Sequence, residues 1–307
     1  MIDILMATYN GEKYVGAQIE SILSQTHPAW QLIIWDDCST DGTMDVLQQC
    51  AARYPDKIIV RQNEKNSGSA SKNFLKMLQT STAPYAMTCD QDDIWMANKI
   101  EVTLQKMRSL EAANPAVPLL VHTDLRVVNQ DLEQISPSLF KLQHMFSERN
   151  ALQQLLVQNI VTGCTMMVNR SLLEYLAVLP KYVIMYDWWC ALLAASMGKI
   201  GFVSEATVLY RQHGKNAVGA KNVHAPGYIL NKLKNLQQSR ASLANTYEQA
   251  ANFSQIYSYL LDSQAKALLE VYSRIPQMSK LQRLSATVRY GFWKGGIARK
   301  IEHILII

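Results

Sequence analysis

Four short apolar runs alternate with segments of helical pattern in the first 90 residues, and this alternation limits the folds that the chain can adopt. The apolar runs are residues 2–7, 32–35, 58–60 and 85–89. The segments of helical pattern between them are residues 12–25, 43–53 and a stretch that runs from the turn at 66–68 through residue 78. Repeated strand–helix units predict an α/β fold with a mixed, mainly parallel sheet that is flanked by helices.

Polar residues follow each of these predicted strands. The polar clusters are Thr8–Asn10, Asp36–Asp37, 66–68 and 90–93. In open α/β sheets, ligands bind beyond the carboxyl ends of the strands. We therefore expect the four clusters to form the functional site of the chain.

The pattern of the sequence changes after this first third. Residues 95–215 mix helical and strand patterns, and residues 227–274 are helical and rich in Gln, Asn, Ser and Ala. Residues 274–300 contain seven basic side chains and no acidic one. We predict a domain boundary near residue 220, which separates a domain at 1–220 from a helical C-terminal extension at 221–307.

Composition narrows the class of protein. The chain has 307 residues, of which 49% are hydrophobic and 18% charged, so it can bury a large core and is not globally disordered. Its five scattered cysteines form no C-x-x-C pair, which argues against a disulfide framework or zinc site and favours a reducing compartment. No signal-like start and no apolar run of roughly 20 residues is present, so we expect a cytoplasmic protein, soluble or peripheral on a membrane.

The strongest local motif is Asp90-Gln91-Asp92, which follows the apolar run at 85–89. Two carboxylates at this spacing can converge on one hard cation, and Mg²⁺ is typically held by one or two carboxylates together with substrate phosphates. The alternative is a surface loop of acids that caps the next helix. The preceding strand and the following Ile94-Trp95 favour the cation site.

A second acidic cluster, Asp36-Asp37, follows the second predicted strand. The carboxylate of Asp37 can accept a hydrogen bond from a pyrimidine N–H, and we predict that it contacts a ligand. For residues 39–42 we favour turn chemistry that starts the next helix, and turn chemistry throughout the cluster is the alternative.

These motifs together resemble the family 2 glycosyltransferases of the GT-A fold, a nucleotide-sugar-binding fold, over roughly residues 1–215. The resemblance is carried by residues 7–10, 35–43 and 90–92 in this order and spacing. It implies that Asp90 and Asp92 hold the sugar, the ribose and a divalent metal, Mg²⁺ or Mn²⁺, with Asp92 as the direct ligand. It also implies a set of residues that bind the nucleotide sugar, namely Thr8, Tyr9, Asn10, Asp37 and Lys72.

Tyr186-Asp187-Trp188-Trp189 opens a predicted helix and resembles the acidic motif that supplies the general base in this family. A carboxylate beside two indoles is partly desolvated, which makes it a stronger base. We therefore predict Asp187 as the catalytic base, with Trp188 and Trp189 near the acceptor sugar. The alternative is an N-cap Asp on an amphipathic helix with tryptophan in the core.

Two further segments complete the predicted site. Arg211 offers a fork to a diphosphate, and His213 can bind the metal or a phosphate, although two solvated cations in a loop are the alternative. The stretch Gly163-Cys164-Thr165 resembles the part of the family that lines the acceptor site. Its alternative is a buried strand with a tight turn before it, and residues 164–168 are predicted as that strand.

The resemblance implies an inverting transfer of a sugar from dTDP-rhamnose or a UDP-hexose to a sugar acceptor, lipid-linked, in bacterial surface polysaccharide synthesis. Parts of the sequence are similar to rhamnosyltransferase-like members. A nucleotidyltransferase acting on sugar phosphates is the alternative, but residues 7–13 lack the glycine-rich basic loop that it needs. The acids at the strand ends argue against a nucleic-acid partner.

The basic C-terminal segment offers two interpretations. The net charge of +5 suits an anionic substrate or a membrane surface as well as nucleic acid. Lys and Arg beside the aromatic and aliphatic residues of 289–307 are typical of contact with anionic lipid, and we favour peripheral binding at the inner face of the cell membrane. A helical tail packed on the core is the alternative. Formation of a homo-oligomer is a further option that the sequence leaves open.

Overall fold

A computed structural model of the chain describes residues 1–214, 219 and 235–307. The chain forms two compact units, each assembled from separate stretches of sequence. The first unit consists of Met1–Leu139, Val161–Leu179 and Gly198–Ala220, and the second of Phe140–Ile160, Pro180–Met197 and Lys221–Ile307. Two segments from the first 220 residues thus group with the C-terminal helices, and the sequence-based boundary at 220 stays a prediction.

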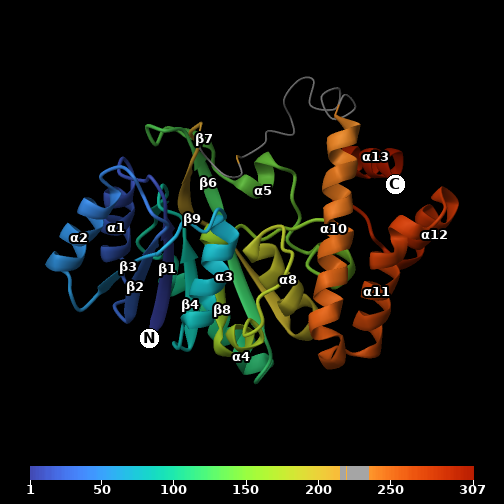
Figure 1. Cartoon of the computed structure of the whole chain (residues 1–307), viewed down its shortest axis with the longest axis horizontal. Helices are drawn as coiled ribbons and strands as arrows, with labels where there is room; N and C mark the ends of the chain where they lie inside the picture. The colour runs from blue at the N-terminus through green and yellow to red at the C-terminus, as the bar shows by residue number, and fades with distance from the viewer. Residues whose placement is uncertain (215–218, 220–234) are drawn as a thin grey trace. The chain divides into compact units, whose positions relative to one another are not determined.

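The first unit is built on one sheet, which has nine strands in the described residues (Figure 1). The strand order is β3-β2-β1-β4-β8-β6-β9-β5, and β7 pairs with β6. Four parallel strands come from the N-terminal third: β1 (Ile2–Thr8), β2 (Trp30–Asp36), β3 (Ile58–Gln62) and β4 (Tyr85–Cys89). They confirm the predicted mainly parallel α/β fold and match the four apolar runs.

Strand register brings the polar clusters to one edge of this sheet. Thr8 at the end of β1 pairs with Asp36 at the end of β2, and Met6 of β1 pairs with Cys89 at the end of β4. Strand β1 is buried along nearly its whole length, as expected for a central parallel strand with both faces covered. The loops that follow β1, β2 and β4 therefore start side by side.

The remaining strands make the sheet mixed. They are β5 (Ile94–Trp95), β6 (Leu119–Val128), β7 (Gln134–Ser136), β8 (Met167–Asn169) and β9 (Lys199–Arg211). Strand β8 runs antiparallel to both β4 and β6, whereas β9 runs parallel to β6 and antiparallel to β5. The pairing of Ile94 in β5 with Leu209 in β9 carries the end of β9 to the segment that follows β4.

The predicted strand at residues 164–168 is wrong in its first half. Residues Gly163–Thr165 form a 3-10 turn, and β8 begins only at Met167. The turn forms because the Thr165 amide and hydroxyl both donate to the Thr162 carbonyl, at 2.9 and 2.7 Å, instead of to a neighbouring strand. The Thr88 hydroxyl of β4 donates to the Gly163 carbonyl at 2.6 Å and holds the turn against the sheet.

The helices of the first unit are α1 (Val15–Leu23), α2 (Thr43–Arg53), α3 (Ala70–Thr80), α4 (Lys99–Ala113) and α7 (Arg170–Tyr175). Each long helix has an apolar face that packs on the unit's core, as Ile19 and Ile22 of α1 show. Side-chain caps set the starts of two helices: Ser69 accepts a hydrogen bond from the Lys72 amide, and Asn169 from the Leu172 amide.

The second unit is helical. Its elements are α6 (Leu152–Leu155), α8 (Tyr186–Met197), α10 (Leu236–Tyr257), α11 (Ser263–Arg274), α12 (Lys280–Tyr290) and α13 (Ile297–Ile306), and the short α5 (Leu139–Leu142) starts at the end of the first unit. An aromatic cluster forms its core, with the Trp189 ring 5.1 Å from that of Phe253 and 6.0 Å from that of Tyr257. In the described parts of the chain, no helix combines the length and the apolar character that crossing a membrane requires.

Candidate functional site

The loops after β1 and β2 are joined by Asn10, which has a positive φ of 48°. The Asn10 amide donates to the Ser39 hydroxyl at 2.9 Å, and its side-chain carbonyl accepts from the Thr40 amide at 2.8 Å. A residue that tolerates the left-handed region and offers a side-chain acceptor suits this position. Asn10, predicted to bind the nucleotide sugar, thus holds two loops together.

Asp36 is the buried anchor of the same edge, and sequence reasoning gave it no role. Its carboxylate accepts hydrogen bonds from the Thr8 hydroxyl at 3.0 Å, the Ser39 amide at 2.8 Å and the Ser39 hydroxyl at 2.5 Å. Thr8, predicted to contact the nucleoside, therefore directs its hydroxyl to Asp36. A carboxylate at the last position of a buried strand is the signal that identifies such an anchor.

Asp37 is also buried, and protein groups satisfy most of its carboxylate. The Ser67 amide and hydroxyl donate to it at 2.8 and 2.7 Å, and the Asn63 amide group donates at 2.7 Å. An ionised carboxylate can accept about four hydrogen bonds, so these three donors leave room for one more. Lys72, which is close to Ser67 in sequence, lies on the first turn of α3, and its side chain is exposed.

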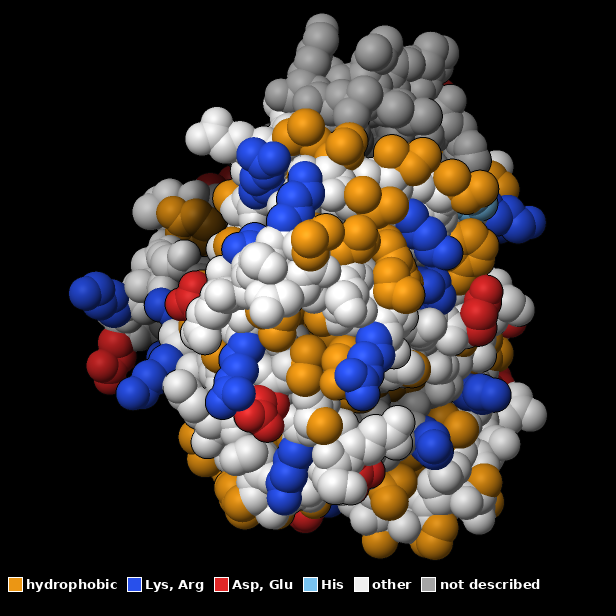
Figure 2. Space-filling model, turned by 90° about the vertical axis from the view of Figure 1, so that its right-hand side faces the viewer, with side chains coloured by type: hydrophobic (Ala, Val, Ile, Leu, Met, Phe, Trp, Pro, Cys, Tyr) orange, Lys and Arg blue, Asp and Glu red, His pale blue; other side chains and the backbone are white. Residues whose placement is uncertain are grey.

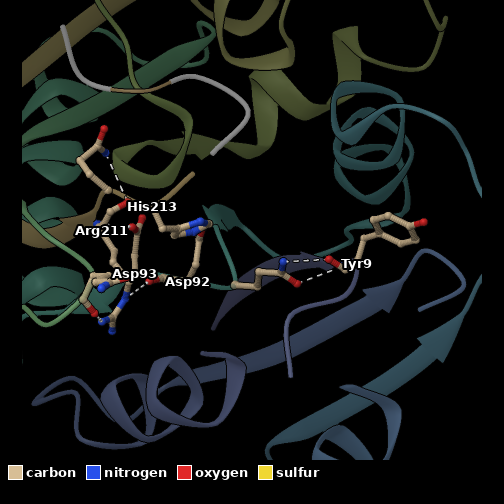
Figure 3. A network of polar contacts seen from close by, with 8 residues as sticks. Tyr9, Asp92, Asp93, Arg211 and His213 are labelled. Carbon is tan, nitrogen blue, oxygen red and sulfur yellow. Dashed lines mark hydrogen bonds and ion pairs between the residues drawn. The ribbon is translucent and has the colours of Figure 1, made fainter. Parts of the chain in front are cut away.

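Gln91 ties the Asp90–Asp92 turn to the loop after β1, as the dashed lines beside Tyr9 in Figure 3 show. Its side chain accepts from the Tyr9 amide at 2.9 Å and donates to the Tyr9 carbonyl at 3.0 Å. The Tyr9 ring itself is half exposed. A Cβ on Gly11 would lie 2.2 Å from the Gln91 Oε1 atom, so a larger residue at position 11 displaces the Gln91 side chain from these hydrogen bonds.

Asp92 and His213 meet in the first unit (Figure 3). The Asp92 Oδ2 and His213 Nε2 atoms are 2.7 Å apart. The His213 ring stacks on Tyr14 with centroids 5.1 Å apart, and the Arg211 guanidinium lies 4.8 Å from the same Tyr14 ring. Sequence reasoning missed Tyr14 because it stands outside every motif, at the start of α1.

Arg211 is buried beside this pair, and hydrogen bonds from both its backbone and its side chain hold it in place. Its guanidinium donates to the Asp92 carbonyl at 2.8 Å and to the Gln130 carbonyl at 2.6 Å, while its amide donates to the Asp93 carboxylate at 3.1 Å. These contacts fix a positive charge next to Asp92, where sequence reasoning expected the diphosphate.

Below the surface of the site lies a tighter acidic cluster of Asp90, Asp93 and Cys164, whose donor atoms all lie within 4.8 Å of one another. Complete burial and the charges of Asp90 and Asp92 raise the pKa of Asp93 well above its usual range. Burial likewise raises the pKa of the Cys164 thiol, so this side chain stays protonated. Sequence reasoning assigned no role to Asp93.

A fully buried lysine lies close to this cluster. The Lys99 ammonium donates to the Thr207 hydroxyl at 3.4 Å and lies 4.8 Å from the centre of the Trp95 ring. Burial lowers its pKa to about 8, and the charge of nearby Asp93 opposes that shift. A lysine at the start of an amphipathic helix is ordinarily solvated, so the sequence gave no indication of this one.

The residues predicted to line the acceptor site are mostly buried. Gly163, Cys164, Thr165 and Trp189 have no or almost no exposed surface, so their side chains serve packing in this structure. Trp189 is the tryptophan of the pair that belongs to the core, next to Phe253. Trp188 is partly exposed and donates through its indole N–H to the Leu155 carbonyl at 2.6 Å.

Asp187 belongs to the second unit, in the first turn of α8. Its Oδ1 atom accepts from the Asn159 side chain at 3.2 Å and from the Trp188 amide at 2.6 Å. Both contacts hold the carboxylate in place at the start of the helix. Its role as the base stays a prediction.

The residues around Asp92 fit a divalent metal. Neighbouring ligands of an octahedral ion with bonds of about 2.1 Å lie about 3.0 Å apart, close to the separation of the Asp92 and His213 donor atoms. Carboxylate oxygens suit Mg²⁺ and Mn²⁺, and an imidazole extends the set to transition metals such as Mn²⁺. Asp92 and His213 are therefore residues that could hold such an ion, in place of the hydrogen bond that joins them in this structure.

Comparison with known proteins identifies relatives of this arrangement. The family model described as glycosyl transferase family 2 matches residues 3–176. The dTDP-rhamnosyl transferase RfbG of Shigella flexneri is 27% identical over 229 residues, which are 70% of this chain and 74% of that protein. The UDP-Glc:alpha-D-GlcNAc-diphosphoundecaprenol beta-1,3-glucosyltransferase WfgD of Escherichia coli is 33% identical over 108 residues, 35% of this chain and 41% of that protein.

Coverage of other relatives is partial. TuaG of Bacillus subtilis (strain 168) is 38% identical over 114 residues, 37% of this chain, and the match spans 44% of its length. Two solved structures share the fold. TarS 1-349 of S. aureus in complex with UDP has a TM-score of 0.55 at 15% identity and covers 95% of this chain and 92% of its own. Mannosyltransferase PcManGT of Pyrobaculum calidifontis, in complex with GDP-Man and Mn²⁺, has a TM-score of 0.54 at 16% identity and covers 99% of this chain and 83% of its own.

The two hydrogen bonds between the Gln91 side chain and the Tyr9 backbone predict the effect of a change at position 11. Gly11→Ala places a methyl group against the Gln91 side chain and should lower the free energy of unfolding by about 1 to 3 kcal/mol. Denaturant unfolding measures the change. Gly214→Ala, where a Cβ meets nothing within 4 Å, is the matched control and should stay near wild type. In a Gln91→Ala background the Gly11→Ala penalty should shrink, and an unchanged penalty would contradict the steric account.

Proposed function

The chain belongs to glycosyl transferase family 2, and from this premise we propose that it transfers a sugar from a nucleoside diphosphate donor to a saccharide acceptor with inversion at the anomeric carbon. The observation that carries the proposal is the meeting of Asp92 and His213 at the carboxyl edge of the sheet, at 2.7 Å. Asp37, Asp90 and Arg211 belong to the same edge and supply groups for a nucleotide and its diphosphate.

Asp92 and His213 would hold the divalent metal, with Asp90 next to them as a further carboxylate. When bound there, the ion supplies positive charge that stabilises the leaving diphosphate. Arg211 adds a fixed positive charge beside it, since carbonyl groups hold its guanidinium in place. We favour Mn²⁺ over Mg²⁺ because an imidazole ligand suits Mn²⁺ better.

Residues at the ends of β1 and β2 would bind the nucleotide of the donor. Asp37 has room for one more hydrogen bond, which an N–H of uracil or thymine can donate. The half-exposed ring of Tyr9 offers a surface against which a base can stack. Thr8 and Asn10 position this loop, and the exposed ammonium of Lys72 suits a phosphate oxygen.

Asp187 is the proposed general base. It takes the proton from the acceptor hydroxyl as that oxygen bonds to the anomeric carbon and the bond from this carbon to the diphosphate oxygen breaks. The transition state is oxocarbenium-like, as in glycoside hydrolysis. The Asn159 and Trp188 donors on Oδ1 orient the carboxylate for this role. Partly exposed Trp188 is the tryptophan that can face the acceptor.

Names of the relatives guide the choice of donor and acceptor. RfbG, named a dTDP-rhamnosyl transferase, aligns with 70% of this chain, whereas WfgD, named for UDP-Glc, aligns with 35%. We therefore propose dTDP-rhamnose first and a UDP-hexose second. The acceptor in the name of WfgD is a sugar, alpha-D-GlcNAc, carried on diphosphoundecaprenol, which supports a lipid-linked saccharide acceptor in bacterial polysaccharide synthesis. The family match leaves the nucleotidyltransferase alternative without support.

A panel of nucleotide sugars tests the donor. We expect dTDP-rhamnose with Mn²⁺ to raise the melting temperature of the protein more than UDP-glucose, UDP-galactose or GDP-mannose at the same concentration, because a ligand that binds only the folded state stabilises it. Thermal shift measures the effect, and dTDP alone shows how much the base and diphosphate contribute. A larger shift with a UDP-hexose would replace dTDP-rhamnose as the donor.

Removing the negative charge of Asp187 tests the base. Asp187→Asn keeps the shape of the side chain and should lower turnover by about two to four orders of magnitude, while donor affinity changes little. Turnover is measured as release of nucleoside diphosphate in the presence of acceptor, and donor affinity by calorimetry. The exposed acid Asp131, changed to Asn, is the matched control. Near-full activity of Asp187→Asn would remove this residue from the reaction.

His213→Gln tests the metal site without reference to turnover. Loss of one of two paired ligands should weaken Mn²⁺ binding by about tenfold or more, as seen when groups around a metal are removed. Electron paramagnetic resonance of free Mn²⁺ measures the affinity directly. His27→Gln, a histidine outside the site, is the control. Equal Mn²⁺ affinity of His213→Gln and wild type would show that His213 is not a ligand.

A further inference from the structure

The C-terminal helix α13 is amphipathic, but its aliphatic stripe faces solvent instead of the core of the second unit. Its outer face carries Ile297, Ile301, Ile304 and Leu305, a spacing that places all four on one side of a helix. Ile297 is 77% exposed and Ile301 54% exposed. A surface helix of a water-soluble protein ordinarily turns its apolar stripe toward the core, so this orientation calls for an explanation.

The inward face of α13 carries one isoleucine and the polar side chains of Glu302 and His303, and contacts of these two polar side chains specify the orientation. Buried Glu302 accepts a hydrogen bond from the Ser239 hydroxyl of α10 at 2.5 Å and lies 3.7 Å from the Lys294 ammonium. Buried His303 meets the Trp293 ring edge to face at 5.9 Å. Burial and the charge of Lys294 lower the pKa of His303 to about 4, which keeps its ring neutral inside. Rotation of the helix would bury isoleucine only by breaking these contacts.

Helix α12 repeats the pattern. Leu281, Leu284 and Val288 are exposed along one side, at the spacing of a helical stripe. Ser279 caps this helix and Gly291 ends it in a left-handed conformation, so its ends are well defined. Both helices belong to the second unit, and their exposed stripes contain aliphatic side chains only.

Basic side chains surround these stripes. Residues 274–300 contain seven Lys and Arg and no Asp or Glu. Figure 2 shows the side of the second unit that carries α12 and α13: orange side chains gather in its upper half with blue ones among them, and red ones lie mostly below and at the sides. Lys280, Arg289 and Lys300 have exposed side chains next to the aliphatic residues.

We propose that the exposed aliphatic faces of α12 and α13 dock on an anionic lipid surface. Aliphatic side chains would enter the boundary between headgroups and acyl chains, while the flanking Lys and Arg contact lipid phosphates. A second copy of this chain fits less well, because two such faces would bring like charges together. The proposal does not depend on the transferase function, although docking would keep the chain where a lipid-linked acceptor resides.

Vesicle cosedimentation of the full chain tests the proposal in the absence of any substrate. Wild type should pellet with vesicles that contain equal amounts of phosphatidylglycerol and phosphatidylcholine and stay in the supernatant with phosphatidylcholine alone. The variant Ile297→Gln/Ile301→Gln should bind the anionic vesicles at least about tenfold more weakly, because it removes aliphatic side chains that enter the lipid. Ile135→Gln/Val178→Gln removes two exposed aliphatic residues of the first unit and should bind like wild type.

A charge variant tests the electrostatic part. Arg289→Gln/Lys300→Gln should weaken binding to anionic vesicles by about tenfold, and Lys76→Gln/Lys181→Gln, two exposed lysines elsewhere, should not. Equal pelleting of wild type and the isoleucine variant would overturn the proposal. The proposal would also be overturned if wild type did not bind vesicles but formed a concentration-dependent dimer, seen by light scattering, and the isoleucine variant did not form this dimer. The side chains changed in these variants are exposed in the folded wild-type protein. Circular dichroism should therefore show that the variants fold like wild type.

Discussion

Crowding of negative charge at one edge of the sheet is the constraint on which the site depends. Five aspartates end or follow β2 and β4, namely Asp36, Asp37, Asp90, Asp92 and Asp93. Carboxylates at such close range cannot all stay ionised without compensation. The protein compensates four of them in three ways, and these differences separate structural from ligand-binding acids.

Internal donors satisfy the first two acids, since hydroxyl and amide groups of Thr8 and Ser39 surround Asp36 and those of Asn63 and Ser67 surround Asp37. Complete burial and the acidic neighbours of Asp93 raise its pKa well above the usual range, which favours its uncharged form. The Asp92 carboxylate meets the imidazole of His213, and the guanidinium of Arg211 is held beside it by a hydrogen bond to the Asp92 backbone carbonyl. An edge of this kind selects cations and the anionic ligands that they bridge.

The second unit combines a conventional core with an unconventional surface. Trp189, Phe253 and Tyr257 form an aromatic core that fixes α8 and α10. In contrast, α13 buries Glu302 and His303 and exposes isoleucine. The buried acid is tolerated because Ser239 and Lys294 satisfy it, and the exposed aliphatic stripe gains a physical role if lipid covers it.

The sequence by itself determined the four parallel strands, the helix at Thr43–Arg53 and the position of the polar clusters at the strand ends, because these follow from local apolar periodicity and turn residues. Only the tertiary structure decided that Tyr14 stacks on His213, that Lys99 is buried beside Trp95, and that Trp189 rather than Trp188 belongs to the core. Tyr14 and His213 are far apart in the chain, and the pairing of β9 with β5 carries the end of β9 toward this place. Local patterns carry no record of such pairings, so a lone tyrosine or a lysine at a helix start looks ordinary in the sequence.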